Sequence, residues 1–580
     1  MRYFRSMSFN ANIQKIVRQF IPADYTVSDW DSLKPYFDQL QNADISTLPQ
    51  LEQWLLQVSE LQSVISEDVC WRQIKMTCDT ANKTYEEAYN YWCTDLQGPI
   101  AIASNDLNNK LIASAAVDQL DKEKYGIYLR GVKNAVDLFR EANVPLQSEE
   151  SVLAQQYGQI AGAMSVDING TTYTMPQASK FLQQADRSLR QQAYNAITER
   201  RAQDKDELNE LFDKLLNLRA QIAKNAGFDN YRDYKFRELG RFDYSVADCE
   251  AFHTAVQKHI VPLVKKIYQH KQKQLALDSL KPYDVDAVAP GEKPLTPFID
   301  GKDLGEKSIA VFDKMGQFFG DCLRKMQAMQ HLDLDSRAGK APGGYNCPLA
   351  ETGVPFIFMN AASTADDVIT MMHEGGHAIH SFVCHDLALS SFKEYPMEIA
   401  ELASMSMELM SMDHWQTFYD NPNDLAKAKA LELDRAITVL PWIAIIDKFQ
   451  HWLYTNIGHS VEQREEAWLS ILAEYDTGCI DHSDYHEFRK LSWQKQLHLY
   501  EVPFYYIEYG IAQLGAIAMW RQYKQNAKGA VDNYLKALSL GNTKNLRELY
   551  STAGISFDFS DSAVQTLGSF VDEEMQKVMH

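Results

Sequence analysis

The segment HEGGHAIH, residues 373–380, combines residue types that bind metal ions and move protons. If the segment is helical, His373 and His377 lie four residues apart, so both rings point to one side of the helix. That spacing suits two imidazole nitrogens on one Zn²⁺ at about 2.0–2.1 Å. Glu374 lies about 100° round the helix from His373, close enough to act on a water at the metal without binding the metal itself. The segment is therefore either a zinc site with its own base or three polar residues that share a helix by chance, and the surrounding residues decide between the two.

The residues just before this segment predict that it lies inside a helix. Ser363 and Thr364 are each followed three positions later by an aspartate, Asp366 and Asp367, and this pattern resembles a capping box, which starts a helix there. Gly375 and Gly376 are costly in a helix interior, by about 1 kcal/mol each relative to Ala. We therefore expect another backbone to approach this helix closely at the two glycines.

A zinc peptidase needs a third protein ligand, which leaves the fourth position for water. The long metzincin motif is absent, because His380 stands where that motif requires Gly. The remaining common option is a glutamate on a following helix, and Pro396 suits the first turn of such a helix. The segment MEIAELASMSMELM offers three glutamates on one helical face, Glu398, Glu401 and Glu408.

HEGGHAIH followed by IAELASMSME resembles the thimet oligopeptidase and oligoendopeptidase F family of zinc metallopeptidases. In that family the histidine motif is followed by Glu-x-x-Ser-x-x-x-Glu, and this chain has Glu401, Ser404 and Glu408 at those places. The segments AGFDNYRDYKFRELG (226–240) and PFYYIEYGIAQLG (503–515) are similar to the bacterial oligoendopeptidase F branch. The resemblance covers about residues 200–575.

The resemblance implies that His373, His377 and Glu401 are the ligands of one Zn²⁺ per chain and that Glu374 is the general base. Two neutral imidazoles and one carboxylate leave the metal site positively charged, which favours ionisation of water there. His380 is then expected to line the core or support the site. Two alternatives stay open for Glu398 and Glu408, which either support a ligand histidine or form a solvated helix face.

A second group of candidate residues lies at 498–509. Hydrolysis of an amide builds an oxyanion, which needs a hydrogen-bond donor besides the metal. In the family, a histidine and tyrosines in this region bind substrate and stabilise the transition state, which implies that role for His498, Tyr505 and Tyr509. The spacing differs from that of thimet oligopeptidase, so the choice between Tyr505 and Tyr506 stays open. We expect Tyr500 and Phe504 to be core residues.

The wider pattern predicts a mostly α-helical protein with a small β-sheet beside the zinc helix. Apolar residues recur with helical spacing over 51–65 and 208–222, and Gly227 suits the end of the second helix. The segment 166–174 alternates around Asn169-Gly170 and predicts a hairpin. GGYN (343–346) and VPFIFMN (354–360) predict one or two strands, with an edge or Gly-rich loop that pairs with a peptide backbone.

Composition limits the partners and the compartment. The net charge of −21 argues against nucleic acid or an anionic membrane as the partner. We find no signal peptide and no run of about 18 apolar residues that would span a membrane. The eight cysteines are scattered, with no Cys-x-x-Cys and no disulfide-scaffold density, which indicates reduced, mostly structural thiols in a cytoplasmic protein.

Together these features predict a large, two-lobed helical zinc endopeptidase that cleaves short oligopeptides in a deep channel. We expect a helical N-terminal lobe at 1–195 and the metallopeptidase domain at 196–580. The alternatives are a zinc metallocarboxypeptidase of similar fold and a non-catalytic peptide-binding protein. The presence of Glu374 argues against a non-catalytic peptide-binding protein, because such a protein needs no general base. The oligomeric state and the preferred peptide bonds do not follow from the sequence.

Overall fold

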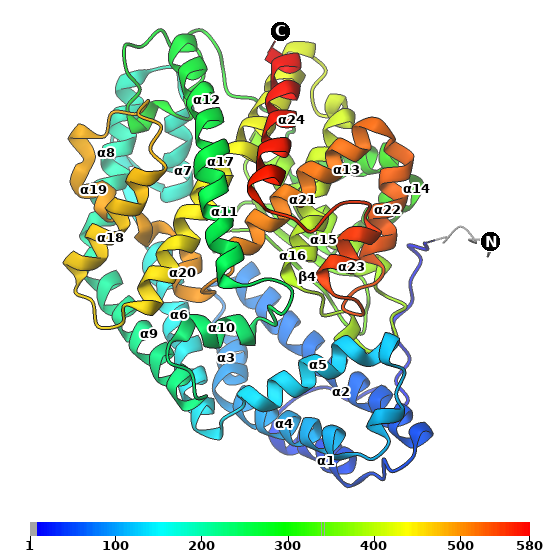
Figure 1. The fold of residues 1–580 in the computed structure, drawn as a ribbon. Coiled ribbons are helices and arrows are strands. Elements are labelled where there is room, and N and C mark those ends of the chain that lie inside the picture. Colours follow the sequence, from blue (N-terminus) through cyan, green and yellow to red (C-terminus); the bar gives the residue numbers. More distant parts are fainter. Residues whose placement is uncertain (1–8, 338, 342, 580) are drawn as a thin grey trace. The chain divides into compact units, whose positions relative to one another are not determined.

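Helices account for most of the chain, which confirms the mostly α-helical prediction (Figure 1). The computed structural model describes residues 9–337, 339–341 and 343–579. The chain divides into two compact units. Unit 1 contains Met1–Phe139, Thr296–Leu425 and Gly515–Phe557, and unit 2 contains Arg140–Leu295, Ala426–Leu514 and Asp558–His580. The sequence-domain boundary expected at 195/196 and the substrate channel stay predictions.

Unit 1 begins with helices that build their own apolar core: α1 (Trp30–Asn42), α2 (Leu48–Cys78), α3 (Lys83–Tyr91), α4 (Gln97–Ala113) and α5 (Lys122–Leu138). The predicted stripe over 51–65 is the buried face of α2, where Leu51, Trp54 and Leu55 are almost fully buried. The Trp54 indole N–H donates to the carbonyl of Leu40 at 2.9 Å, so this large side chain leaves no polar atom unpaired.

The rest of unit 1 contains a small sheet and the helices around it: α13 (Gly301–Met315), α14 (Gln317–Ala328), β3 (Leu332–Asp335), β4 (Tyr345–Cys347), β5 (Phe356–Ala361), α15 (Ala365–Val383), α16 (Met397–Ser411), α22 (Ala527–Leu538) and α23 (Leu546–Thr552). The strand order is β3-β5-β4, with β3 parallel and β4 antiparallel to β5. Both predicted strands are therefore present, and β5 leads directly into α15.

Unit 2 is also helical, with one hairpin: α6 (Val144–Gly162), β1 (Ser165–Ile168), β2 (Thr171–Thr174), α7 (Met175–Ser179), α8 (Arg187–Gln203), α9 (Lys205–Asn225), α10 (Tyr231–Glu238), α11 (Val246–His259), α12 (Val261–Gln274), α18 (Val461–Glu474), α19 (His486–Lys490), α20 (Leu497–Glu501) and α24 (Asp561–Met579). A boundary between the units falls within each of two long helices, α17 (Pro422–Thr455) and α21 (Tyr506–Gln525).

The predicted hairpin and the predicted end of helix α9 are both present in unit 2. The hairpin turns at Asn169 and Gly170, whose φ angles of 53° and 79° are those of a tight hairpin turn. Helix α9 buries the predicted 208–222 stripe, and Gly227 follows its C-cap with a φ of 88°. Within the described part of the chain, no helix combines the length and apolar character needed to span a bilayer.

Candidate active site

Helix α15 presents the histidine motif as the sequence predicts. Its N-cap is Thr364, whose backbone N–H donates to Asp367 Oδ2 at 2.8 Å, while the Asp367 N–H donates to Thr364 Oγ1 at 3.3 Å. This capping box satisfies two otherwise unpaired donors and fixes where the helix starts. His373, Glu374 and His377 follow in the interior of the helix.

The two glycines of the motif are explained by close packing. A Cβ atom on Gly376 would lie 2.6 Å from the Cα atom of Ser404 and 2.7 Å from the carbonyl oxygen of Ala403, both on α16. A Cβ atom on Gly375 would lie 2.4 Å from the ring of Phe312 on α13. The expected backbone approach is therefore confirmed at Gly376, whereas a side chain occupies the space at Gly375. Only glycine lets α16 come this near to α15.

Helix α16 brings Glu401 to the two histidines. Pro396 is its N-cap, just before the first turn, and Glu401 is almost fully buried. Ser404 Oγ donates to Glu401 Oε2 at 3.1 Å and holds the carboxylate from one side. The nearby methionines, Met371, Met372, Met405 and Met407, are buried core residues.

His373, His377 and Glu401 form a cluster, here called the histidine–glutamate cluster, whose geometry fits one metal ion. The two Nε2 atoms lie 3.2 Å apart, and Glu401 Oε2 lies 3.4 Å from His373 Nε2 and 3.7 Å from His377 Nε2. Two ligands of a tetrahedral Zn²⁺, each about 2.0–2.1 Å from the metal, are separated by about 3.3–3.4 Å. The donor set and its spacing therefore suit zinc.

Glu408 orients one histidine of the histidine–glutamate cluster. Its Oε1 atom lies 2.5 Å from Nδ1 of His373, and its side chain is 6% exposed. A carboxylate at Nδ1 places the ring proton there and leaves Nε2 as the free donor atom that faces Glu401. Glu398 is also buried, so neither glutamate belongs to a solvated face, and Glu408 is the one that contacts His373.

The cluster concentrates negative charge around Glu374. Burial raises the pKa of Glu374 to about 7, and the Glu401 and Glu408 carboxylates add to this rise. Burial lowers the pKa of His373, but its contacts with Glu401 and Glu408 outweigh burial and raise it well above its usual value. The carboxylates that attract a proton to His373 attract a metal cation in the same way. Glu374 Oε2 has no hydrogen-bond partner among the described residues.

His380 lies outside the histidine–glutamate cluster. It is fully buried, and its ring stacks on Tyr395 with centroids 3.4 Å apart. Burial holds the pKa of His380 well below its usual value, so the ring is neutral. This position agrees with the expected role in lining the core.

Strand β4 runs beside Glu374. Asn346 Nδ2 donates to the backbone carbonyl of Glu374 at 3.4 Å and joins β4 to α15. Because β4 is the outer strand in the order β3-β5-β4, one of its edges has no strand partner in the part of the chain that the structure describes. An unpaired strand edge accepts an extended peptide by main-chain hydrogen bonds.

The predicted residues of unit 2 form an aromatic cluster of His498, Tyr505, Tyr506 and Tyr509. Gln496 Nε2 donates to His498 Nδ1 at 2.8 Å, so the ring proton is on Nε2, which donates to the Tyr509 hydroxyl oxygen at 3.3 Å. The Tyr506 hydroxyl donates to Gln496 Oε1 at 3.1 Å, and the Tyr505 ring packs against Tyr509 with centroids 5.0 Å apart. The roles of these residues stay predictions.

Two neighbours of this cluster are core residues, as expected. Tyr500 is fully buried and stacks on Tyr157 with ring centroids 4.4 Å apart, and Phe504 is fully buried. Gln496 was missed by sequence reasoning, because a glutamine in a short connection has no motif or periodicity that marks it. Its contacts with His498 and Tyr506 become visible only in three dimensions.

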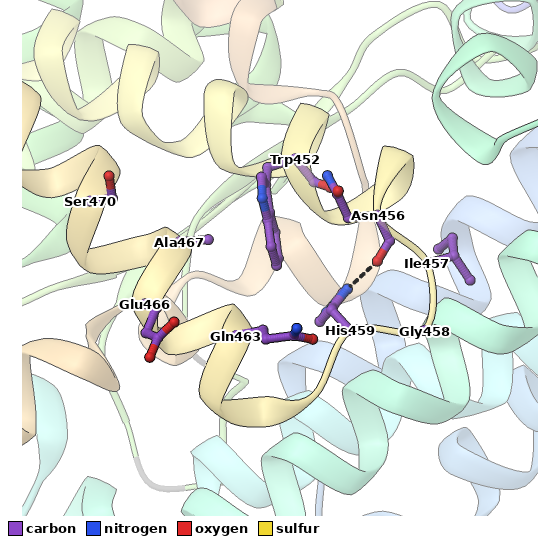
Figure 2. A pocket seen from close by; sticks show the side chains of 9 residues that line it. All are labelled: Trp452, Asn456, Ile457, Gly458, His459, Gln463, Glu466, Ala467 and Ser470. Atoms are coloured by element: carbon purple, nitrogen blue, oxygen red, sulfur yellow. Dashed lines mark hydrogen bonds between the residues drawn. The ribbon is translucent and has the colours of Figure 1, made fainter.

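An open pocket of about 580 Å³ lies where α17 meets α18 in unit 2 (Figure 2). Its side chains include Trp452 and His459, whose ring centroids lie 4.8 Å apart, and His459 Nδ1 donates to the Asn456 carbonyl at 2.8 Å. None of the predicted site residues lines this pocket. The pocket therefore shares no lining residue with either cluster.

Comparison with protein families shows matches over most of the chain. Residues 180–569 match a model of Peptidase family M3, and residues 20–139 match a model of the Peptidase M3 N-terminal domain. An oligoendopeptidase F homolog of Borreliella burgdorferi is 22% identical over 86% of this chain and 81% of its own length. Oligopeptidase PepF of Bacillus subtilis is 21% identical over 79% of this chain and 70% of its own length.

Solved structures agree with these matches. PZ peptidase A, solved with an inhibitor, has a TM-score of 0.91 and 26% identity, covering 96% of this chain and 99% of its own. Oligoendopeptidase-F from Enterococcus faecium has a TM-score of 0.64 and 16% identity, covering 95% of this chain and 97% of its own, which indicates a shared fold.

Proposed function

The chain belongs to peptidase family M3 and is a metallo-oligoendopeptidase of that family, and we propose that His373, His377 and Glu401 hold its catalytic zinc while Glu374 is the general base. One zinc ion per chain is proposed at this centre. The observation that carries the proposal is the convergence of two Nε2 atoms and one carboxylate oxygen at 3.2–3.7 Å from one another.

The zinc supplies Lewis acidity when bound, which polarises a peptide carbonyl and favours ionisation of water. Glu374 takes the proton of the attacking water and later delivers it to the leaving amine. Its Oε2 atom is buried and unpaired, and a pKa of about 7 is close to the optimum for a base that works at neutral pH. Asn346 donates to the backbone carbonyl of Glu374 and thereby joins the helix that carries this residue to β4.

The proposed substrates are short, unfolded peptides. An extended peptide that adds to the unpaired edge of β4 gains main-chain hydrogen bonds without a strict demand on its sequence. The family resemblance assigns transition-state donors to His498, Tyr505 and Tyr509, and the hydroxyl groups of the aromatic cluster provide neutral donors of that kind. We expect peptides of roughly 5–20 residues to be cleaved and stable folded proteins to resist, because folded chains cannot pair in this way.

The cytoplasm is the proposed compartment. All eight cysteines carry free thiols, which suits a reducing environment.

The proposal is tested with an internally quenched peptide, the zinc content of the enzyme and a chelator. Glu374→Gln should keep its zinc and lose at least the ~10²–10⁴-fold in rate that a general acid–base group typically contributes. Glu398→Gln is the matched control, because Glu398 is also buried and undergoes the same chemical change. Product masses should show cleavage at internal bonds. A Glu374→Gln enzyme that keeps zinc and parental activity would place the base elsewhere.

A further inference from the structure

A second group of side chains of metal-ligand types lies within unit 2, where α11 contacts α17; both helices are labelled in Figure 1. Cys249 and His253 are four residues apart on α11, and Asp447 and His451 are four residues apart on α17. Each helix therefore presents two ligand-type side chains on one face, one turn apart. All four residues are buried, with at most 7% of any of them exposed. We call them the α11–α17 cluster.

The polar atoms of this cluster converge. His253 Nε2 lies 2.8 Å from Asp447 Oδ2, and His451 Nε2 lies 3.2 Å from the same oxygen. Cys249 offers its Sγ atom within 4.8 Å of the Asp447 carboxylate and of a ring nitrogen of His451. These separations are close to the roughly 3.3–3.4 Å between two ligands of one tetrahedral ion, so small side-chain rotations bring the atoms into ligand positions.

The cluster has unused hydrogen-bonding capacity. Within the described residues, Nδ1 of His451 and Oδ1 of Asp447 have no hydrogen-bond partner, and Nε2 of His451 has only the 3.2 Å contact with Asp447 Oδ2. Burial raises the pKa of Asp447, but His451 and His253 outweigh burial and hold it well below its usual value, so the carboxylate is charged. Buried polar atoms of native proteins normally have partners, and such exceptions require an explanation.

We propose that Cys249, His253, Asp447 and His451 form a second, structural metal site that holds one Zn²⁺. A thiolate and a carboxylate neutralise the two charges of the ion, so the complete site is uncharged, as a buried position requires. Sulfur and imidazole ligands favour zinc over magnesium or calcium, and four protein ligands with no open position are typical of a structural zinc site. The metal would join α11 to α17 within unit 2.

The site would also support the aromatic cluster. Gln450, the neighbour of His451, accepts the backbone N–H of Phe504 at 2.5 Å, and the rings of His451 and Phe504 lie 5.4 Å apart. Phe504 has a φ of 66°, which is strained for a residue with a side chain. Because Tyr505 comes next in the chain, fixing His451 would fix the turn from which the tyrosines project.

Cobalt substitution of the full chain distinguishes the two metal sites. Only a site with a thiolate ligand gives a sulfur-to-cobalt charge-transfer band in the near ultraviolet, and the histidine–glutamate cluster contains no sulfur. The parent protein should bind about two metal ions per chain and show this band. His377→Ala should lose the catalytic metal and peptide hydrolysis but keep the band. An error in the proposed catalytic centre can therefore be told apart from an error in the proposed second metal site.

Cys249→Ser should lose the band and one equivalent of metal. Cys322→Ser is the control, because Cys322 is an equally buried thiol in unit 1. This variant should keep the band and the full metal content. If Cys249→Ser does not fold, His451→Gln should lower zinc stoichiometry by one equivalent. A cobalt-saturated parent without the band, or a band that survives in Cys249→Ser, would overturn the proposal. The cluster would then be a hydrogen-bonded Asp–His pair beside a structural thiol.

Discussion

Glu408 provides a sharp test of how the catalytic metal is held. Its carboxylate accepts the Nδ1 proton of His373 at 2.5 Å and is 6% exposed, so this charged hydrogen bond is shielded from water. A residue that hydrogen-bonds to a metal ligand without binding the metal itself typically contributes 10–100-fold to metal affinity, equivalent to about 1.4–2.7 kcal/mol. Glu408→Gln keeps an oxygen that accepts the same proton and removes only the charge, whereas Glu408→Ala removes both.

We therefore expect zinc affinity to fall about tenfold in Glu408→Gln and about 100-fold in Glu408→Ala. Competition with a fluorescent zinc chelator measures both values. Glu398→Gln is the control, because Glu398 is equally buried on α16 and undergoes the same chemical change. An Ala variant whose zinc affinity stays within about threefold of the parent would refute the view that Glu408 orients His373.

Three further predictions follow from other parts of the structure. Gly376→Ala should push α16 away from α15 and cost about 1–3 kcal/mol in thermal unfolding, whereas Gly126→Ala, with open space around it, should be neutral or stabilising. Tyr509→Phe should lower kcat by about 10²–10³ with unchanged zinc content if its hydroxyl meets the oxyanion, whereas Tyr500→Phe should lower the melting temperature and leave kcat near normal. Burial raises the pKa of Glu501 to about 7, so the folded state binds a proton at Glu501 more tightly than the unfolded state does. The free energy of unfolding that Glu501 contributes is therefore lost as the pH rises towards 7. Glu501→Gln should therefore be more stable relative to the parent at about pH 8 than at about pH 5, and an equal difference at both pH values would contradict the assignment.

The features that could be predicted from the sequence are those encoded by short spacings. The capping box at Thr364 and Asp367, the turn at Asn169-Gly170 and the apolar stripe of α9 each need fewer than about twenty neighbouring residues, and each is present as predicted. The glycines of the motif also predicted a close contact, although the partner of Gly375 proved to be a phenylalanine ring.

The features that escaped prediction depend on contacts between distant segments. His253 and Asp447 are 194 residues apart, and their hydrogen bond follows from the packing of α11 against α17. The spacing Cys249-x-x-x-His253 and the spacing Asp447-x-x-x-His451 are each visible in the sequence, but neither indicates the other. The sequence also leaves two roles open for Glu408, because only the fold shows that Glu408 faces His373.

The most direct test of the account is anomalous diffraction at the zinc absorption edge from crystals of the zinc-loaded full chain. The account predicts a strong peak bonded to His373 Nε2, His377 Nε2 and the Glu401 carboxylate at about 2.0–2.2 Å. A zinc-loaded crystal with no peak at these atoms, or with a peak bonded to His380 in place of Glu401, would contradict the proposed metal centre and the chemistry assigned to it.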